Sequence, residues 1–390
     1  MPRPRVYLTE LSCACALGRS NADILANASK GSCAGMIPYA DDIPNRTVLF
    51  GAVPGDLPTI DDPEFDFRTN RLLLQAVQGF GSALPAFLAR HSAARVAVVL
   101  GASTTGMDEA QTAVNAWLAT GDRPSAFRFS QIELGTPAEF LKRQLGLAGP
   151  AYTISTACSS STKAFGAARR LIAAGVVDAA VVGGVDARCR FALNGFHALG
   201  ALSQGLSRPF ADDRDGINLG EGVALFLMEK TPMASAGRRC SVVCAGCGES
   251  SDAYHATAPD PAGAGAEAAM RMALAEAGLA ADDIAYVNCH GTGTPANDAM
   301  ERAVIARVFR SPVFRDPVAA AGAPWPAGRP VVESTKAMTG HCLGAAGAVE
   351  AAIGWLYLTA GRVTGPVLSN SFAFGGSNAC VALVPEEVRV

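Results

Sequence analysis

The sequence predicts an α/β fold, and three observations lead to this prediction. Runs of Val, Ile and Ala without polar alternation are typical of strands buried on both faces of a sheet. Alanine-rich stretches of helical length separate these runs, which favours an alternating α/β architecture. The chain has 390 residues, of which 49% are hydrophobic and 17% charged. This length is sufficient for a large core and for two domains or two fused halves.

The expected elements follow one another from the N-terminus. The first apolar run is interrupted by Thr9 and Glu10, so we interpret it as a strand and not as a signal peptide. Further strands are expected at residues 95–104, 151–156, 176–186, 224–229, 241–250 and 283–294. Helices are expected at 160–174, 263–277 and 346–360. The segment 312–330 is rich in Pro, Ala and Gly and should form a surface loop.

Two stretches of the sequence resemble each other. ISTACSSSTKAFGAARRLI and ESTKAMTGHCLGAAGAVEAAI each contain Ser-Thr, then small residues, then a Gly-Ala-Ala helical pattern. This internal repeat predicts two related α/β halves, residues 1–237 and 238–390.

Charge and composition argue against several classes of protein. The formal net charge is −3 at pH 7, so the chain has no overall basic surface for nucleic acid. We expect no membrane span, because no uncharged apolar stretch reaches 18 residues. The 11 cysteines are odd in number and scattered, which favours reduced thiols and a cytoplasmic protein. Neither a P-loop nor a dinucleotide-binding GxGxxG arrangement is present.

Three cysteines have a spacing that occurs in iron–sulfur proteins. They are Cys240, Cys244 and Cys247. A regular strand here would put Cys240 and Cys244 on one face and Cys247 on the other. We therefore expect no metal site at these residues.

Cys158 is the first candidate for chemistry. It follows an expected strand and precedes Ser159, Ser160 and a helical pattern. The unpaired amides and positive dipole of a helix N-terminus favour a thiolate. The same amides can stabilise an oxyanion. The alternative is a buried cysteine that only packs.

Two of the five histidines lie where strands of an α/β sheet end, which is the usual place for a site. His290 lies in NCHGTGTP, and His341 lies in TKAMTGHCLGAAG. Lys336 and Glu350 flank His341 and would orient the site if they form a buried pair. The alternatives are structural histidines and two solvated surface charges.

The C-terminal stretch SNSFAFGGSNACVAL predicts a strand, a turn and a second strand. Gly375 and Gly376 allow positive φ or a close backbone approach. Asn370 and Asn378 can brace such a turn through bonds to the backbone. A plain hairpin is the alternative to a functional loop.

Together these motifs resemble those of the β-ketoacyl-acyl carrier protein synthases of the thiolase-like fold. Six segments occur in the family's order over nearly the whole chain: TACSSS, SRPFADDRDGINLGEGVALFLME, CGESSDAYHATAPDPAGAG, NCHGTGTPANDAME, STKAMTGHCLGAAGAVEA and NSFAFGGSNA. The resemblance implies two pseudo-symmetric halves in a layered α-β-α-β-α core.

The resemblance also implies a role for each candidate. Cys158 would accept the acyl chain. His290 and His341 would polarise the thioester carbonyl of a malonyl unit as it loses carbon dioxide, and Lys336 with Glu350 would support them.

The remaining site residues implied by the resemblance surround the substrate. Phe374 would be the gate, with Gly375 and Gly376 beside it, and its amide would join that of Cys158 in an oxyanion hole. Thr292 and Thr294 would line the channel for a phosphopantetheine arm. Phe196 would line the acyl pocket.

A Cys-His-His set resembles that of the elongating synthases, since priming synthases have Asn at the second histidine and thiolases have a second catalytic cysteine. The resemblance implies an acyl carrier protein as partner, no bound cofactor or metal, and a homodimer or a heterodimer with a related subunit.

Ala373 and the short segment after residue 360 depart from the usual pattern. Some motifs resemble the synthases of bacterial aryl polyene clusters. The alternatives are a non-catalytic subunit like a chain length factor, which would lack the cysteine, and a cysteine hydrolase.

Overall fold

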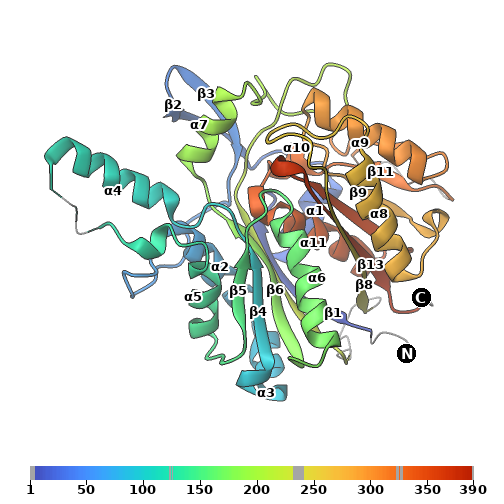
Figure 1. Ribbon diagram of the computed structural model, residues 1–390, viewed down its shortest axis with the longest axis horizontal. Helices are drawn as coiled ribbons and strands as arrows, with labels where there is room; N and C mark the ends of the chain where they lie inside the picture. The colour runs from blue at the N-terminus through green and yellow to red at the C-terminus, as the bar shows by residue number, and fades with distance from the viewer. Residues whose placement is uncertain are drawn as a thin grey trace.

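The computed structural model describes residues 5–388 apart from 123, 125, 232–240, 322–324 and 326–327 (Figure 1). The predicted boundary between the halves, at 237/238, lies outside the described residues, and so does Cys240. That boundary stays a prediction.

Within the described residues, eleven strands form one mixed sheet in the order β10-β11-β9-β12-β13-β8-β1-β7-β6-β4-β5. Their bounds are β1 Tyr7–Cys15, β4 Val96–Gly101, β5 Ala151–Ile154, β6 Ala179–Asp186, β7 Gly222–Glu229, β8 Val242–Ser251, β9 Tyr286–Asn288, β10 Val313–Phe314, β11 Val331–Glu333, β12 Val367–Phe372 and β13 Ser377–Pro385. A separate hairpin pairs β2 (Met36–Ile43) with β3 (Arg46–Gly51). The strands predicted from the sequence are confirmed.

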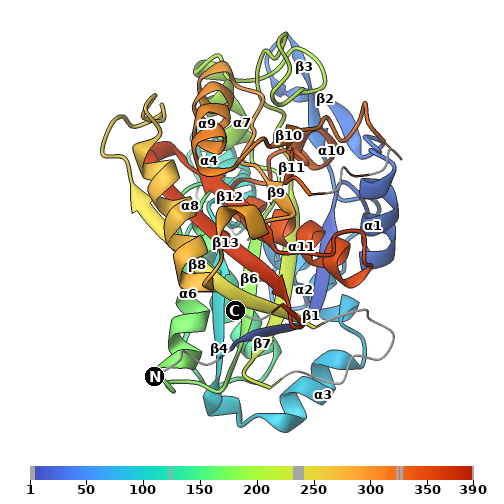
Figure 2. The ribbon, with the colours of Figure 1, turned by 90° about the vertical axis from the view of Figure 1, so that its right-hand side faces the viewer.

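The sheet divides into two halves at β1, which pairs with β7 over its length and with β8 only at Tyr7 and Leu8. Helices cover both halves in layers (Figure 2). The helices are α1 Asn21–Ser29, α2 Arg68–Gly79, α3 Ala83–Arg90, α4 Met107–Thr120, α5 Thr136–Gln144, α6 Ser160–Ala173, α7 Arg190–Ala198, α8 Ala264–Ala277, α9 Pro295–Val308, α10 Lys336–Thr339 and α11 Ala346–Thr359. Helices α6 and α11 lie between the half-sheets, α2 and α5 cover one outer face, and α8 with α9 cover the other. This is the expected α-β-α-β-α order of the thiolase-like fold.

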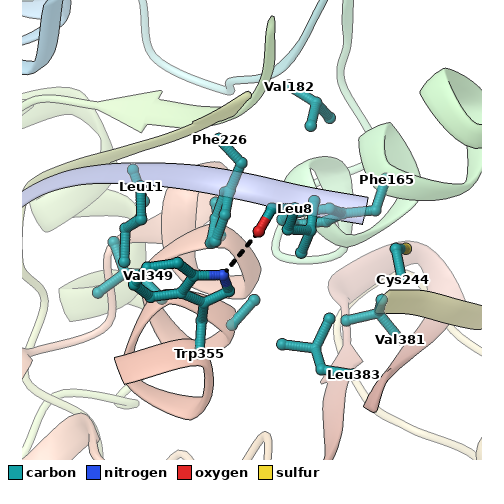
Figure 3. Close-up of a cluster of buried hydrophobic side chains, with 14 of the residues drawn as sticks. Leu8, Leu11, Phe165, Val182, Phe226, Cys244, Val349, Trp355, Val381 and Leu383 are labelled. Atoms are coloured by element: carbon teal, nitrogen blue, oxygen red, sulfur yellow. Dashed lines mark hydrogen bonds between the residues drawn. The ribbon is translucent and has the colours of Figure 1, made fainter. Parts of the chain in front are cut away.

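One apolar core joins the two halves (Figure 3). Side chains from β1, β6, β7 and α6 meet side chains from β8, β13 and α11 in a single buried cluster. Within it, the indole N–H of Trp355 donates to the carbonyl oxygen of Leu8 at 3.0 Å. The first strand and the last long helix are therefore held together through both packing and a buried hydrogen bond.

Two expectations about individual segments need correction. The segment 312–330 is not only a surface loop, because it contributes β10 and packs Trp325 against Tyr286, with ring centroids 5.0 Å apart. The thiols of Cys244 and Cys247 lie on one face of β8, where they hydrogen-bond to each other. The register of β8 shifts between Cys244 and Gly246, so a bulge breaks the regular alternation.

No single helix among the described residues is long and apolar enough to cross a membrane. Helices α2 and α3 meet that length and composition only as a pair, across an 86° bend.

The first turn of α6 lies directly over β4. A Cβ added to Gly101 would lie 2.2 Å from the backbone nitrogen of Ser161. Glycine at this position therefore lets the helix start approach the strand end, and this approach places the residues just before α6.

Replacement of Gly101 by Ala tests this packing. We expect Gly101→Ala to lower the free energy of unfolding by about 3 kcal/mol, because backbone atoms must move apart. Thermal unfolding measures the change. Gly135→Ala is the matched control, since Gly135 has a φ of −74° and open space around it. Equal unfolding temperatures for the two variants would contradict the close approach.

Candidate active site

Cys158 lies in a tight turn between β5 and α6. The preceding residue, Ala157, has a φ of 50°, a left-handed conformation that costs energy for a residue with a side chain. Ser160 holds this turn by accepting the backbone N–H of Thr156 at 2.8 Å. The strained turn aims the thiol at the start of α6, as the strand-to-helix pattern predicts.

The thiol of Cys158 is buried and protonated. Burial raises its pKa from 9.0 to about 12, although the charge of Lys336 and the backbone N–H groups of Phe374 and Cys158 act in the opposite direction. The expectation of a thiolate favoured by the helix N-terminus is therefore wrong, because desolvation outweighs these donors. The two N–H groups remain the expected oxyanion hole, and both lie at the sulfur.

Both candidate histidines face this sulfur. The rings of His290 and His341 lie nearly perpendicular, with centroids 5.3 Å apart. One donor atom from each ring and the sulfur of Cys158 all lie within 4.8 Å of one another. Residues that follow β5, β9 and α10 thus converge on one point.

The histidines are neutral hydrogen-bond donors. Burial, together with the charge of Lys336, holds the pKa of each well below its usual range. The backbone N–H of Leu343 donates to Nδ1 of His341 at 3.1 Å, so Nε2 carries the proton of the neutral ring. That Nε2 is buried without a protein partner among the described residues and is free to donate to a substrate.

Lys336 and Glu350 form a buried ion pair, as expected, and not two surface charges. The ammonium of Lys336 contacts a carboxylate oxygen of Glu350 and the backbone carbonyl of His290. Side-chain exposure is 1% for Lys336 and 2% for Glu350. Burial raises the pKa of Glu350 to about 7 against the attraction of Lys336. The pair positions the His290 loop, and the positive charge of Lys336 adds to the effect of burial in keeping both imidazoles neutral.

The loop that carries Phe374 lies beside the Cys158 thiol. The ring of Phe374 stacks on Phe196 of α7, with centroids 5.4 Å apart and planes 23° apart. Gly375 and Gly376 both have positive φ, at 81° and 71°. Ala373 has an extended backbone that alanine adopts without strain, so its presence leaves the resting loop unaltered.

Two segments hold this loop in place: the one before α8, and the turn that contains Cys158. Asn378 donates to a carboxylate oxygen of Asp252 at 2.7 Å, and the backbone N–H of Asp252 donates to Gly376 at 2.8 Å. Ser159 lies 2.9 Å from the hydroxyl of Ser377. Asn370, in contrast, lies in β12 and reaches the buried Glu301.

A cavity of about 190 Å³ leads to the three reactive groups. The predicted residues Phe196, Thr292, Thr294 and Phe374 all line it, with Cys158, His290 and His341. The hydroxyls of Thr292 and Thr294 lie 2.8 Å apart. The structure thus brings the predicted cysteine, both histidines and the four predicted substrate-facing residues to one cavity, with Lys336 and Glu350 behind it.

Two acidic residues of α9 were not singled out. Glu301 accepts the backbone N–H groups of His290 and Gly291, at 2.9 and 2.7 Å, and Asp298 accepts that of Gly293 at 3.2 Å. They hold the histidine loop in place. The sequence contains a signal for this role, because Asp298 and Glu301 are three residues apart in NDAME. This spacing places both on one face of the helix that follows HGTGT.

The same three reactive groups are close enough together to surround a metal ion. A neutral imidazole ligates through a bare nitrogen, whereas Leu343 leaves the proton of His341 on the nitrogen that faces the site. The arrangement therefore suits donation to a developing oxyanion better than ligation. The absence of a metal and of a cofactor stays a prediction.

These groups define a class of enzyme. A buried cysteine beside two amide donors can carry an acyl group as a thioester. Two neutral imidazole donors in a dry cavity can stabilise negative charge on a second thioester oxygen. Fold and site together are those of the thiolase-like class.

Comparison with known proteins agrees with this class. The sequence matches the N-terminal domain of beta-ketoacyl synthases over residues 71–234 and the C-terminal domain over residues 241–367. It is 38% identical to 3-oxoacyl-(acyl-carrier-protein) synthase 2 of Vibrio cholerae over 67% of this chain and 63% of that protein. It is 32% identical to nodulation protein E of Rhizobium leguminosarum bv. trifolii over 97% and 98% of the two chains.

Solved structures give the same result. A chain in the complex of the ketosynthase ApeO with its chain length factor ApeC, from Xenorhabdus doucetiae, has a TM-score of 0.86, 38% identity and 98% coverage of both chains. The ishigamide ketosynthase/chain length factor has a TM-score of 0.82 and 28% identity, with 98% of this chain and 100% of that chain covered. The chain belongs to the beta-ketoacyl synthase family.

Protonation of the two histidines can be measured directly. We expect the Cε1 signals of His290 and His341 in ¹³C-labelled protein to stay fixed between about pH 8 and pH 5.5, because both rings remain neutral. Their assignment comes from the His290→Ala and His341→Ala spectra. A histidine with an ordinary pKa would shift over this range. A titrating signal from either ring would contradict the neutral pair.

Proposed function

We propose that this protein is an elongating β-ketoacyl-acyl carrier protein synthase. The observation that carries the proposal is the convergence of the Cys158 thiol, two amide donors and two neutral histidines in one buried cavity. The related 3-oxoacyl-(acyl-carrier-protein) synthases support the class of reaction. We extend the proposal to a cytoplasmic protein without a bound cofactor, whose substrates arrive on the phosphopantetheine arm of an acyl carrier protein.

The reaction divides into two stages. In the first, the sulfur of Cys158 attacks an acyl thioester, and the N–H groups of Cys158 and Phe374 stabilise the oxyanion. The proton lost by Cys158 balances the one gained by the departing carrier thiol. In the second, His290 and His341 donate to the malonyl thioester oxygen while carbon dioxide leaves. The resulting carbanion attacks the acyl–cysteine carbonyl, and the bond from that carbon to the sulfur of Cys158 breaks. The released thiolate takes up a proton from solvent, and the ketoacyl product remains on the carrier.

A non-catalytic subunit like a chain length factor is the second candidate. It is considered because two of the matching structures are complexes of a ketosynthase with a chain length factor. The intact set of Cys158, His290 and His341 supports the catalytic reading instead. A cysteine hydrolase mechanism would not explain the second histidine or the gate loop.

We also propose a specialised elongation pathway of the aryl polyene type. The motifs GVDARCRFALNGF and GESSDAYHATAPDP support it through their resemblance to synthases of those clusters. Mass spectrometry of the acyl group carried by Cys158 in cells tests this part, and saturated chains alone would overturn it.

We propose that the partner is a second subunit of the same fold, either another copy or a relative. Helix α4 projects from the body (Figure 1) and exposes Trp117 and Leu118, the latter to 81%. Among the described residues, β5 ends the sheet with one unpaired edge. Ketosynthase complexes with a chain length factor among the structural matches support such a subunit as the occupant of this surface.

Substitutions at the site test the reaction. We expect Cys158→Ala to lose acyl loading by about 1,000-fold or more, since the nucleophile is gone, while malonyl-carrier decarboxylation persists. His341→Ala should lower decarboxylation by about 100-fold and loading far less. Radiolabelled carbon dioxide release and acyl-protein mass measure the two steps. Cys33→Ala, at another free thiol, should load normally. A folded wild-type protein without decarboxylation would refute the proposed activity.

The assembly is tested through α4. We expect Leu118→Glu to convert the dimer into monomers in sedimentation velocity, because a buried, unpaired carboxylate opposes association. Met272→Glu introduces the same charge at an exposed apolar residue of α8 and should leave the dimer intact. An unchanged Leu118→Glu assembly would show that the partner binds elsewhere.

A further inference from the structure

Helix α7 carries Phe196 but has little apolar anchorage of its own. Of its nine residues only Leu193 is buried. Helices this short are marginal without tertiary contacts, so polar contacts must contribute much of the placement of α7. Its N-cap residue, Cys189, makes no side-chain cap bond.

A carboxylate from another element caps this helix instead. Asp108, in the first turn of α4, accepts both the backbone N–H and the Nε–H of Arg190 at 2.9 Å. Arg190 also donates to the backbone carbonyl of Asp108 at 3.3 Å. One carboxylate therefore satisfies an unpaired amide of α7 and balances the charge of its first side chain.

A second carboxylate, that of Asp42, holds the residues just before α7. The guanidinium of Arg188 donates to both carboxylate oxygens of Asp42 in β2 at 2.7 Å. It also lies 3.8 Å from the carboxylate of Asp108. The side-chain amide of Asn194, one turn into the helix, donates to the backbone carbonyl of Asp42 at 2.9 Å. Together Asp42, Asp108, Arg188 and Arg190 form a polar clamp at the start of α7.

The clamp acts on the site through one aromatic stack. Phe196, near the end of α7, stacks on the gate residue Phe374, whose backbone N–H lies at the sulfur of Cys158. We infer that Asp108 is a positioning residue that sets α7, and with it the wall of the acyl cavity and the resting position of the gate. Asp108 is not among the residues that line the cavity.

The inference deepens the proposed function by naming what selects the acyl chain. Asp298, Glu301 and Lys336 hold the His290 loop, and none of them belongs to the clamp. Loss of the clamp should therefore change which groups reach Cys158 and leave malonyl decarboxylation unchanged.

The main experiment does not depend on the proposed activity. Folded Asp108→Asn protein is alkylated with iodoacetamide and with a bulky aryl maleimide, and the Cys158 peptide is quantified by mass spectrometry. We expect the ratio of maleimide to iodoacetamide rates to rise by about fivefold, the factor that corresponds to the ~1 kcal/mol lost when the charged acceptor of Arg190 becomes a neutral one. An unchanged ratio would overturn the inference.

A matched control and a double mutant separate positioning from general loosening. Asp178→Asn removes a similar carboxylate, one paired with Arg95 at the surface, and should leave the ratio at the wild-type value. Arg190→Gln and the double variant with Asp108→Asn should give the same rise as Asp108→Asn alone, because they break one contact. Additive rises, or a rise in the control, would overturn a specific clamp.

The catalytic readout then distinguishes the two proposals. In Asp108→Asn we expect relative loading of long over short acyl-carrier substrates to rise about fivefold, with decarboxylation within about twofold of wild type. Parallel loss of both steps would contradict the positioning role. Absence of both steps in the wild-type protein, with the alkylation ratio still changed, would refute the proposed function and leave the clamp standing.

Discussion

The rest of the site depends on the buried ammonium of Lys336 and its contacts with Glu350 and the carbonyl of His290. Its positive charge is buried behind the residues that line the cavity, and it joins α10 to α11 and to the loop of His290. Its charge acts on three groups at once, since it lowers the pKa values of both imidazoles and of the Cys158 thiol. An ion so fully buried is tolerated only because Glu350 and a carbonyl oxygen accept hydrogen bonds from it.

Desolvation gives the site its chemical character. The resting groups around the cavity are a protonated thiol and two neutral imidazoles, so the pocket holds its positive charge one layer behind the reacting atoms. Donors fixed in such a dry environment stabilise a developing oxyanion without having to reorganise. The histidine loop is held by Glu301 from behind, which keeps those donors in place before substrate arrives.

The sequence predicted the elements that depend on local pattern. Cys158 lies at the expected strand-to-helix turn and His290 at the expected strand end, whereas the short helix α10 separates His341 from β11. Resemblance to a family then linked segments that are far apart in the chain.

Effects that depend on neighbours distant in sequence were not predicted. The pKa of Cys158 follows from the groups that cover it, which a strand–helix pattern does not reveal. The bulge in β8 breaks the alternation used to place Cys247, because it is set by pairing with β13. Asp108 and Arg190 are 82 residues apart, and neither belongs to a recognisable motif.

The central position of β1 has a consequence for how the protein comes to be folded. It pairs with β7 and β8 and accepts a hydrogen bond from Trp355 of α11, so the earliest part of the chain contacts segments made more than 200 residues later. At ribosomal rates of about 5–20 residues per second, that strand waits on the order of ten seconds or more for its neighbour. During this time its apolar side chains are exposed, and the late closure of a sheet with such distant pairs is slow. Nascent chains of this protein should therefore depend on chaperones more than their final stability would suggest.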